Sequence, residues 1–123
     1  MKRLSTLLML SVLSLGAFAQ ENKGLTTYLC DTEVDALLCA GSCQSETSAT
    51  LDFNVDVKSS MVTKYLYQGG KLLEMTTFGN CAVADEKNWL CRSSSGSSAY
   101  KMVNGTYFAK SVLGSSTLYW CAK

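Results

Sequence analysis

Residues 51–57, Leu-Asp-Phe-Asn-Val-Asp-Val, decide the fold class of this 123-residue chain. Leucine, phenylalanine and valine alternate there with aspartate and asparagine, so one face of an extended segment is apolar and the other is polar. A period of two is typical of a half-buried β-strand. The aspartates also imitate the start of an EF-hand calcium loop, but Val57 stands where such a loop needs glycine. We therefore interpret this stretch as a strand.

Three turn sequences downstream of this strand predict β-hairpins. Paired glycines and Asn-Gly permit the positive φ angles of type I′ turns, which match the twist of the strands that they join. Gly69-Gly70 joins strand-like runs over 61–67 and 71–78, and Asp85-Glu86-Lys87 turns a second hairpin over 81–91. Asn104-Gly105 joins 99–103 to 106–112, and 116–121 is expected to be the closing strand.

The segment before residue 51 contains the one helix that the sequence predicts, over 32–40. Thr32 can cap its first turn, and Gly41 can end it. Val34, Leu37 and Leu38 fall on one face at helical spacing. The flanking segments are expected to be an opening strand (24–30) and a polar loop (44–50).

These patterns together predict a mainly β protein. We expect a small antiparallel barrel or bent sheet of hairpins, with one short N-terminal helix and disulfide staples. Closure or strong bending would protect the edges of such a sheet.

The N-terminus has the pattern of an export signal. Lys2 and Arg3 precede an apolar run over 4–16, and Ala17-Phe18-Ala19 provides a small-x-small cleavage pattern. The run is too short to span a bilayer, so we expect no membrane span. We expect 1–19 to be a signal peptide and 20–123 to be a single domain, in the periplasm of a bacterium or secreted from it.

All six cysteines follow this segment. An even set in an oxidising compartment predicts three disulfides, which would compensate for the small core of so short a domain. A zinc site is the rival interpretation. It is disfavoured because the spacings are irregular and no Cys-x2-Cys pair occurs, so no metal is expected.

The cysteine pairing follows from where the strands place each residue. Cys81 and Cys91 face one another across the second hairpin, so they are expected to pair. Cys30 and Cys121 would join the first strand to the last, which leaves the awkward pair Cys39 and Cys43. The alternative joins Cys30 to Cys39 or Cys43, and Cys121 to the remaining one.

The chain contains no histidine, which removes the commonest general base and metal ligand. With all cysteines paired as well, we expect neither an enzyme nor a cofactor. A carboxylate hydrolase built on Asp85 and Glu86 is the remaining catalytic alternative. Acidic residues predominate over 20–56 and basic ones over 57–123, but the bases are dispersed, so nucleic-acid binding is not expected.

A serine-rich stretch (92–98) predicts an adaptable surface loop between two strands. Arg92 and Tyr100 flank it, and further aromatic residues follow. Period two sends Tyr107 and Phe108 to opposite faces, so some of these rings could be exposed as binding anchors.

Scattered positions of the chain resemble periplasmic inhibitors of C-type lysozymes, which are small β-barrels. The residues that carry the resemblance are Tyr28, Cys30 and Asp31, then Ser95, Gly96 and Tyr100, then Lys110 and Cys121. The chain departs from the pattern where Tyr107 stands for an expected tryptophan and Ser111 for a glycine. The resemblance implies that Ser95 and Lys110 enter the lysozyme active site and contact its acidic groups.

The sequence therefore predicts an exported module that binds another protein. An inhibitor or immunity protein acting on a cell-wall hydrolase or toxin is the preferred interpretation. A structural or adhesive subunit of the cell envelope is the alternative, and the oligomeric state is left open. The residues expected to contact the partner are Arg92, Ser95, Gly96, Tyr100, Tyr107 and Lys110.

Overall fold

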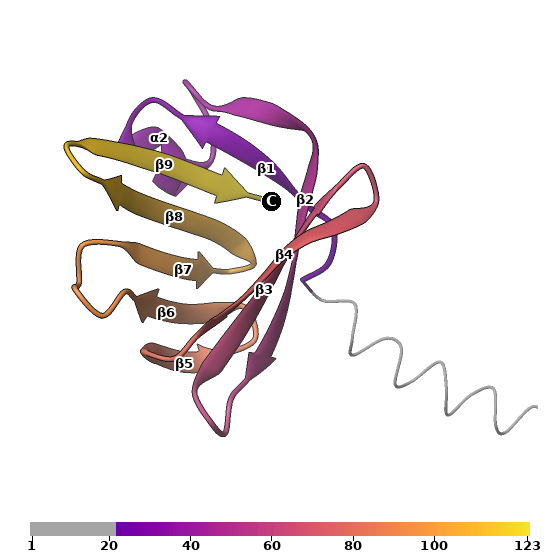
Figure 1. The fold of residues 1–123 in the computed structure, drawn as a ribbon, viewed down its shortest axis with the longest axis vertical. Helices are drawn as coiled ribbons and strands as arrows, with labels where there is room; N and C mark the ends of the chain where they lie inside the picture. Colours follow the sequence, from indigo (N-terminus) through magenta and orange to yellow (C-terminus); the bar gives the residue numbers. More distant parts are fainter. Residues whose placement is uncertain (1–21) are drawn as a thin grey trace, which may run out of the picture.

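The computed structural model describes residues 22–123, in which nine strands form one antiparallel sheet with one short helix beside it (Figure 1). The elements are β1 (Leu25–Cys30), α2 (Glu33–Leu38), β2 (Gln44–Asp56), β3 (Met61–Gln68), β4 (Lys71–Phe78), β5 (Cys81–Asp85), β6 (Asn88–Arg92), β7 (Ala99–Val103), β8 (Thr106–Leu113) and β9 (Ser116–Ala122). The predicted fold class is confirmed as a bent sheet of hairpins. The expected signal peptide, 1–19, lies outside the described residues.

The sheet curls into a half-barrel, and the first and last strands of the chain pair in its middle. Its order is β4-β3-β2-β1-β9-β8-β7-β6-β5, so β1 joins a meander of β2–β4 to a meander of β5–β9. Figure 1 shows β2–β4 running steeply across the ladder of β5–β9. The two edge strands, β4 and β5, are joined by residues 79–80 alone, so the curl brings the sheet's ends near one another. No helix in the described part of the chain has the length and apolarity to cross a membrane.

The concave face of the half-barrel holds the larger core. Phe53 lies with its ring centroid 5.4 Å from that of Trp89 and 4.7 Å from that of Tyr107, in the tilted geometry that aromatic pairs prefer. A smaller cluster lies on the convex face beneath α2 and includes Ala36 and Phe108. Tyr107 and Phe108 thus belong to opposite faces, as their alternation predicts.

The helix begins as predicted but ends early and is oriented differently. The hydroxyl of Thr32 accepts a hydrogen bond from the Asp35 N–H (3.1 Å), which confirms the N-cap. Cys39 takes a left-handed conformation (φ 52°) that ends the helix after Leu38. Ala36 is the fully buried residue. The predicted apolar face lies toward solvent instead, with exposed side chains at Val34, Leu37 and Leu38.

The three predicted turns are confirmed, and one predicted loop is wrong. Gly69 and Gly70 have φ of 59° and 81°, as a type I′ turn requires. Residues 44–50, expected to be a loop, form the first half of β2. Their polar side chains concealed the strand, which exists because β1 pairs with it from one side and β3 from the other. Backbone pairing, rather than an apolar face, sets this segment's conformation.

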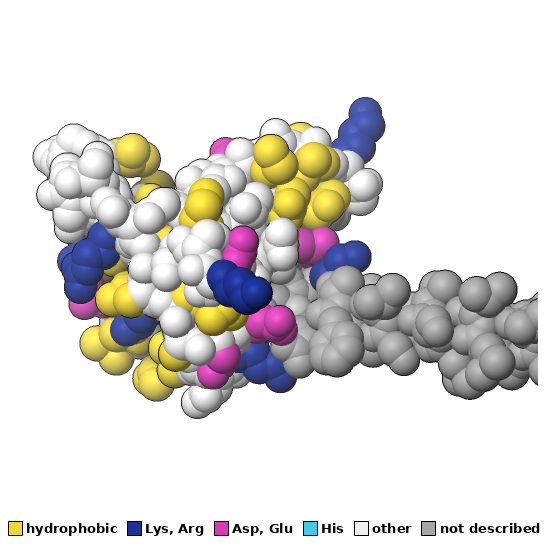
Figure 2. Space-filling model, turned by 90° about the horizontal axis from the view of Figure 1, so that it is seen from below, with side chains coloured by type: hydrophobic (Ala, Val, Ile, Leu, Met, Phe, Trp, Pro, Cys, Tyr) yellow, Lys and Arg dark blue, Asp and Glu magenta, His cyan; other side chains and the backbone are white. Residues whose placement is uncertain are grey.

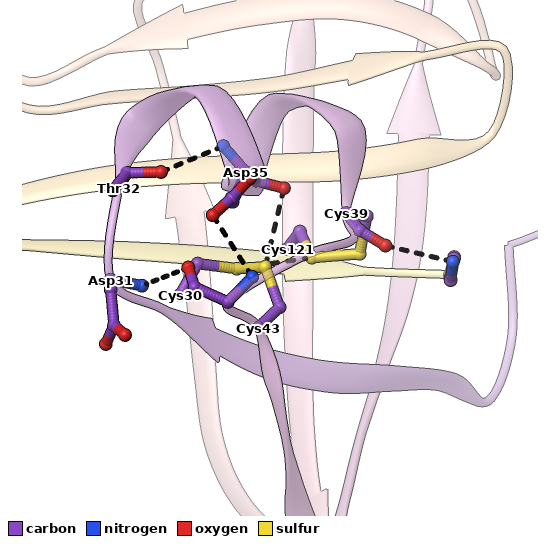
Figure 3. Close-up of a disulfide and its surroundings, with 9 residues drawn as sticks. Cys30, Asp31, Thr32, Asp35, Cys39, Cys43 and Cys121 are labelled. Carbon is purple, nitrogen blue, oxygen red and sulfur yellow. Dashed lines mark hydrogen bonds between the residues drawn. A yellow bond between two sulfur atoms is a disulfide. The ribbon is translucent and has the colours of Figure 1, made fainter.

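Three disulfides link all six cysteines of the described residues, and one of the expected pairs is confirmed. Cys81 lies directly opposite Cys91 and is bonded to it. The preferred pairs Cys30–Cys121 and Cys39–Cys43 are wrong, and the alternative holds. The bonds are Cys30–Cys43 and Cys39–Cys121, side by side beneath α2 (Figure 3).

The error in pairing has a physical cause. β1 and β9 are neighbours, and the sulfur atoms of Cys30 and Cys121 are only 3.8 Å apart. Cys39 and Cys43 could therefore each bond to either of these sulfur atoms. The end of α2 decides the pairing, because it places Cys39 beside Cys121 of β9 and leaves Cys43 beside Cys30 of β1. Strand order alone could not predict that choice.

Candidate functional site

A cleft of about 340 Å³ lies on the concave side of the half-barrel, above the aromatic core. One wall comes from β3 and β4, the opposite wall from β7–β9, and the floor from β1 and β2. Its lining residues are Thr27, Glu46, Ala49, Leu51, Lys64, Leu66, Gln68, Leu73, Glu74, Tyr100, Tyr107, Ala109, Ser111, Trp120 and Cys121. Such a concave, largely apolar cavity with a few polar groups is the usual form of a binding site.

The apolar part of the cleft is built from side chains on opposing walls. Leu66 and Leu73 line it from β3 and β4, and Trp120 lines it from β9. Tyr100 of β7 stacks on Phe78 of β4, with ring centroids 4.6 Å apart and an interplanar angle of 19°. This stack crosses the side on which the sheet does not close, so it fixes the distance between the two walls.

The polar part of the cleft centres on an ion pair between neighbouring strands. The Nζ atom of Lys64 lies 3.5 Å from Oε1 of Glu74, and the lysine side chain is 19% exposed while the glutamate side chain is 53% exposed. A partly buried lysine gains from a nearby carboxylate because burial disfavours an unpaired charge. Glu46 lines the same cleft from β2. A ligand would therefore meet one cationic and two anionic side chains beside the apolar walls.

Tyr107 lies at the base of the cleft and is only 2% exposed. Burial raises the pKa of its phenol far above the usual value, and the negative charge of Glu74 raises it further. The phenol therefore stays neutral at physiological pH. It can act as a hydrogen-bonding group of the cleft but not as a base.

The strand β4 forms the rim of the cleft and one edge of the sheet. Within the described residues it pairs with β3 on one side and with no strand on the other. Leu72, Leu73 and Met75 on this strand are 52%, 58% and 63% exposed. Leu73 lines the cleft, whereas Leu72 and Met75 stand opposite Tyr67 and Tyr65 of β3 on the outer face. Hydrophobic side chains gather in groups on the surface shown in Figure 2.

The structure separates the residues that the sequence predicts as partner contacts into three places. Tyr100 and Tyr107 face the cleft. Lys110 lies beneath the helix on the convex side, where its Nζ atom is 3.2 Å from Oε1 of Glu33. The remaining three lie at the end of β6 or in the exposed loop that follows it; they are Arg92, Ser95 and Gly96.

The serine-rich loop is held by its own hydroxyl groups. The Ser95 hydroxyl lies 3.3 Å from that of Ser93 and 2.7 Å from that of Ser97. Ser98 ends the loop, and its hydroxyl accepts a hydrogen bond from the Val112 N–H (3.2 Å). The loop is therefore exposed but anchored to β8, the strand that carries Lys110.

Sequence reasoning missed the ion pair and the tryptophan of the cleft. One signal was available for the lysine. Val62, Lys64 and Leu66 share one face of β3, so a charge interrupts an otherwise apolar stripe. Glu74 and Trp120 carried no comparable signal, because the closing of the half-barrel brings their strands to the same cavity.

No protein-family model, curated protein or solved structure matches this chain. The resemblance to lysozyme inhibitors therefore stays a prediction based on the residues that carry it. The geometry described above is the basis for the function proposed below.

Proposed function

We propose that this chain is an exported, non-catalytic module that binds an extended segment of another protein along β4. In this proposal the partner is a cell-wall hydrolase or a toxin, which the module inhibits or neutralises in the periplasm or outside the cell. The observation that carries the proposal is the exposed, apolar edge strand beside the cleft.

The edge strand β4 supports binding of another chain because three large apolar side chains are exposed along it, although it also carries Lys71 and Glu74 and its pairing with β3 contains a register shift. Natural proteins protect sheet edges with charges, proline, bulges or covering segments, since a bare edge pairs with other strands. The chain contains no proline at all, and β4 has eight residues with Leu72, Leu73 and Met75 exposed. A strand added to this edge would pair with its unused backbone groups, and this mode of peptide recognition recurs widely.

The cleft gives such an added strand its selectivity. Side chains of a strand alternate between the two faces of a sheet, so every second residue of the partner would point toward the concave side. The walls there offer apolar contacts from Leu66, Leu73 and Tyr100. The other residues would lie on the outer face, beside Leu72 and Met75. The expected partner segment is therefore extended and apolar at alternate positions.

Purified protein should inhibit one or more enzymes in a panel of lysozymes and cell-wall amidases, or bind a toxin in a calorimetric titration. Replacing Met75 by lysine puts a charge into the added-strand interface and should weaken inhibition at least about tenfold, equivalent to about 1.4 kcal/mol. Leu113→Lys is the matched control, because Leu113 is equally exposed (64% against 63%) but lies at the end of β8. It should leave inhibition unchanged.

Two results would contradict this proposal. If Met75→Lys and Leu113→Lys weakened inhibition equally, β4 would not be the binding surface. If Lys110→Ala alone abolished inhibition, the partner would bind the surface that the family resemblance implies. Absence of inhibition across the panel, with no toxin bound, would contradict the inhibitor function as a whole.

The same edge also supports the alternative of a structural or adhesive envelope subunit. Two copies could pair through β4, and repeated pairing would build an assembly. Concentration-dependent growth in light scattering, abolished by Met75→Lys but not by Leu113→Lys, would favour this alternative over capture of a different protein.

A further inference from the structure

Four of the six cysteines form one cluster beneath α2, where Cys121 of the last strand joins three cysteines from the start of the domain, Cys30, Cys39 and Cys43 (Figure 3). The disulfides Cys30–Cys43 and Cys39–Cys121 lie side by side there. The sulfur atoms of Cys30, Cys43 and Cys121 all lie within 4.8 Å of one another, and the fourth sulfur is bonded to Cys121. Three sulfur atoms therefore lie close together, and that of Cys39 adjoins them through its bond to Cys121.

The spacing of the sulfur atoms suits a tetrahedral metal site. Zinc binds thiolates at about 2.3 Å, which makes each sulfur–sulfur edge of the tetrahedron about 3.8 Å long. Cys30 and Cys121 already have their sulfur atoms 3.8 Å apart. After reduction, rotation of the side chains can bring the formerly bonded sulfur atoms to this separation.

The backbone around the cluster is positioned by contacts other than the disulfides. Cys30 and Cys121 lie on the paired strands β1 and β9, and Cys43 directly precedes β2, which pairs with β1. Cys39 is held by the Lys123 ammonium group, whose Nζ atom donates a hydrogen bond to its carbonyl oxygen (2.9 Å). These backbone contacts do not depend on the disulfides, so they favour a close arrangement of the ligands and reduce the ordering needed when a metal binds.

We propose that, once both disulfides are reduced, Cys30, Cys39, Cys43 and Cys121 bind one Zn²⁺ ion as a four-cysteine site. A dithiol reductant supplies two electrons and two protons to each disulfide and becomes a disulfide itself. The four thiols then lose their protons as the metal binds. Cys39 and Cys43 are separated by three residues, within the usual spacing of zinc ligands. The site would tie α2 to the sheet as the disulfides do, so oxidation would release the ion without unfolding the domain.

The surroundings fit a closed site with one entrance. Cys30, Cys39 and Cys121 are 5%, 3% and 1% exposed, whereas Cys43 is half-buried and gives access. Four thiolates on Zn²⁺ carry a double negative charge, which the nearby ammonium of Lys123 offsets in part. The carboxylate of Asp35 opposes it, but that group is engaged by the Ser42 N–H (3.1 Å).

Cobalt(II) titration of the phosphine-reduced protein without oxygen tests the site, because a tetrahedral four-thiolate complex has a characteristic visible absorption. We expect one Co²⁺ per chain, displaced by Zn²⁺. Zinc should also protect the four cluster cysteines from alkylation in mass spectrometry and leave Cys81 and Cys91 reactive. Cys81→Ser/Cys91→Ser is the matched control, which removes one disulfide pair outside the cluster and should leave the absorption unchanged.

The variant Cys39→Ser/Cys121→Ser should lose the four-thiolate absorption and bind more than about 100-fold more weakly, since changing even an outer-shell partner costs about 10–100-fold. Circular dichroism shows whether each reduced variant is folded. If reduction unfolds the protein, restoration of the fold by one equivalent of Zn²⁺ supports the site. The proposal would be overturned if the reduced protein failed to bind Co²⁺ or if both double variants bound it equally weakly. It would also be overturned if the affinity for Co²⁺ were the same in urea.

Discussion

Replacing Cys39 and Cys121 by alanine should destabilise the domain more than replacing Cys81 and Cys91. The first pair joins the end of α2 to the last strand and closes a loop with a sequence separation of 82 residues. The second pair closes a hairpin with a separation of 10 residues. A longer loop means that the cross-link removes more conformational freedom from the unfolded chain. Alanine avoids placing an unpaired hydroxyl in the buried positions.

The loop-entropy relation gives the expected size of the difference. For separations of 82 and 10 residues it corresponds to about 4.5 and about 2.7 kcal/mol of lost stability. The difference of about 1.8 kcal/mol should shift the melting temperature by a further 7–14 °C or so for a domain of this size. Burial acts in the same direction, because Cys39 and Cys121 are both buried whereas only Cys91 of the hairpin pair is.

Urea denaturation of the two double variants, followed by tryptophan fluorescence, measures both losses. Peptide mapping under non-reducing conditions confirms that the remaining bridges form as in the parent protein. Equal destabilisation, or the reverse order, would refute the loop-entropy reasoning. A mapped Cys30–Cys121 bridge in the parent protein would refute the pairing itself.

Three further predictions concern the helix and the turn beside it. Gly41→Ala should cost more stability than Gly69→Ala in chemical denaturation. Both glycines have positive φ (69° and 59°), so either alanine should cost about 1–2 kcal/mol for its backbone conformation. Only the new Cβ at position 41 would also lie 2.6 Å from Oδ1 of Asp35, and this clash should add at least about 1 kcal/mol. Hydrogen bonds from Ser42 hold the pKa of Asp35 below its ordinary value of 3.8. This carboxylate therefore stabilises the fold above pH 3.8, and its contribution is lost as the pH falls through the lowered pKa. Asp35→Asn should flatten the plot of stability against pH in this range, and an unchanged slope below about pH 4 would contradict the prediction. Ala36→Leu should lower the melting temperature by overpacking a fully buried position, at a cost of about 1–3 kcal/mol, and a neutral effect would show that α2 is free to move away from the sheet.

Local signals in the sequence were sufficient for most of the strands and turns. Alternation around Phe53 predicted a strand, and Gly69-Gly70 and Asn104-Gly105 predicted their hairpins, because side-chain period and positive φ depend on near neighbours. Cys81 and Cys91 could be paired for the same reason, since a hairpin fixes which residues face each other. Residues 44–50 were predicted wrongly, because pairing with distant strands made a polar segment extended.

The candidate site was only partly accessible from the sequence. Tyr100 and Tyr107 were expected to contact a partner, and both line the cleft. Lys64 and Trp120 could not be connected with them, because they belong to strands that meet only when the sheet curls. The resemblance to lysozyme inhibitors implies that Lys110 contacts a partner together with Ser95, and this stays a prediction. In the structure the Nζ atom of Lys110 lies 3.2 Å from Oε1 of Glu33 on the helix.

The sequence by itself determined the fold class, the hairpin turns and the cysteine content, because each depends on backbone preferences and spacing within a few residues. The tertiary structure alone decided three other features: the pairing of the four clustered cysteines, the exposed edge at β4 and the cleft between the two walls. The pairing of β1 with β9 and the curl of the sheet bring together residues from opposite ends of the chain. No local pattern specifies such a closure, since its energy comes from contacts between segments that the sequence keeps far apart.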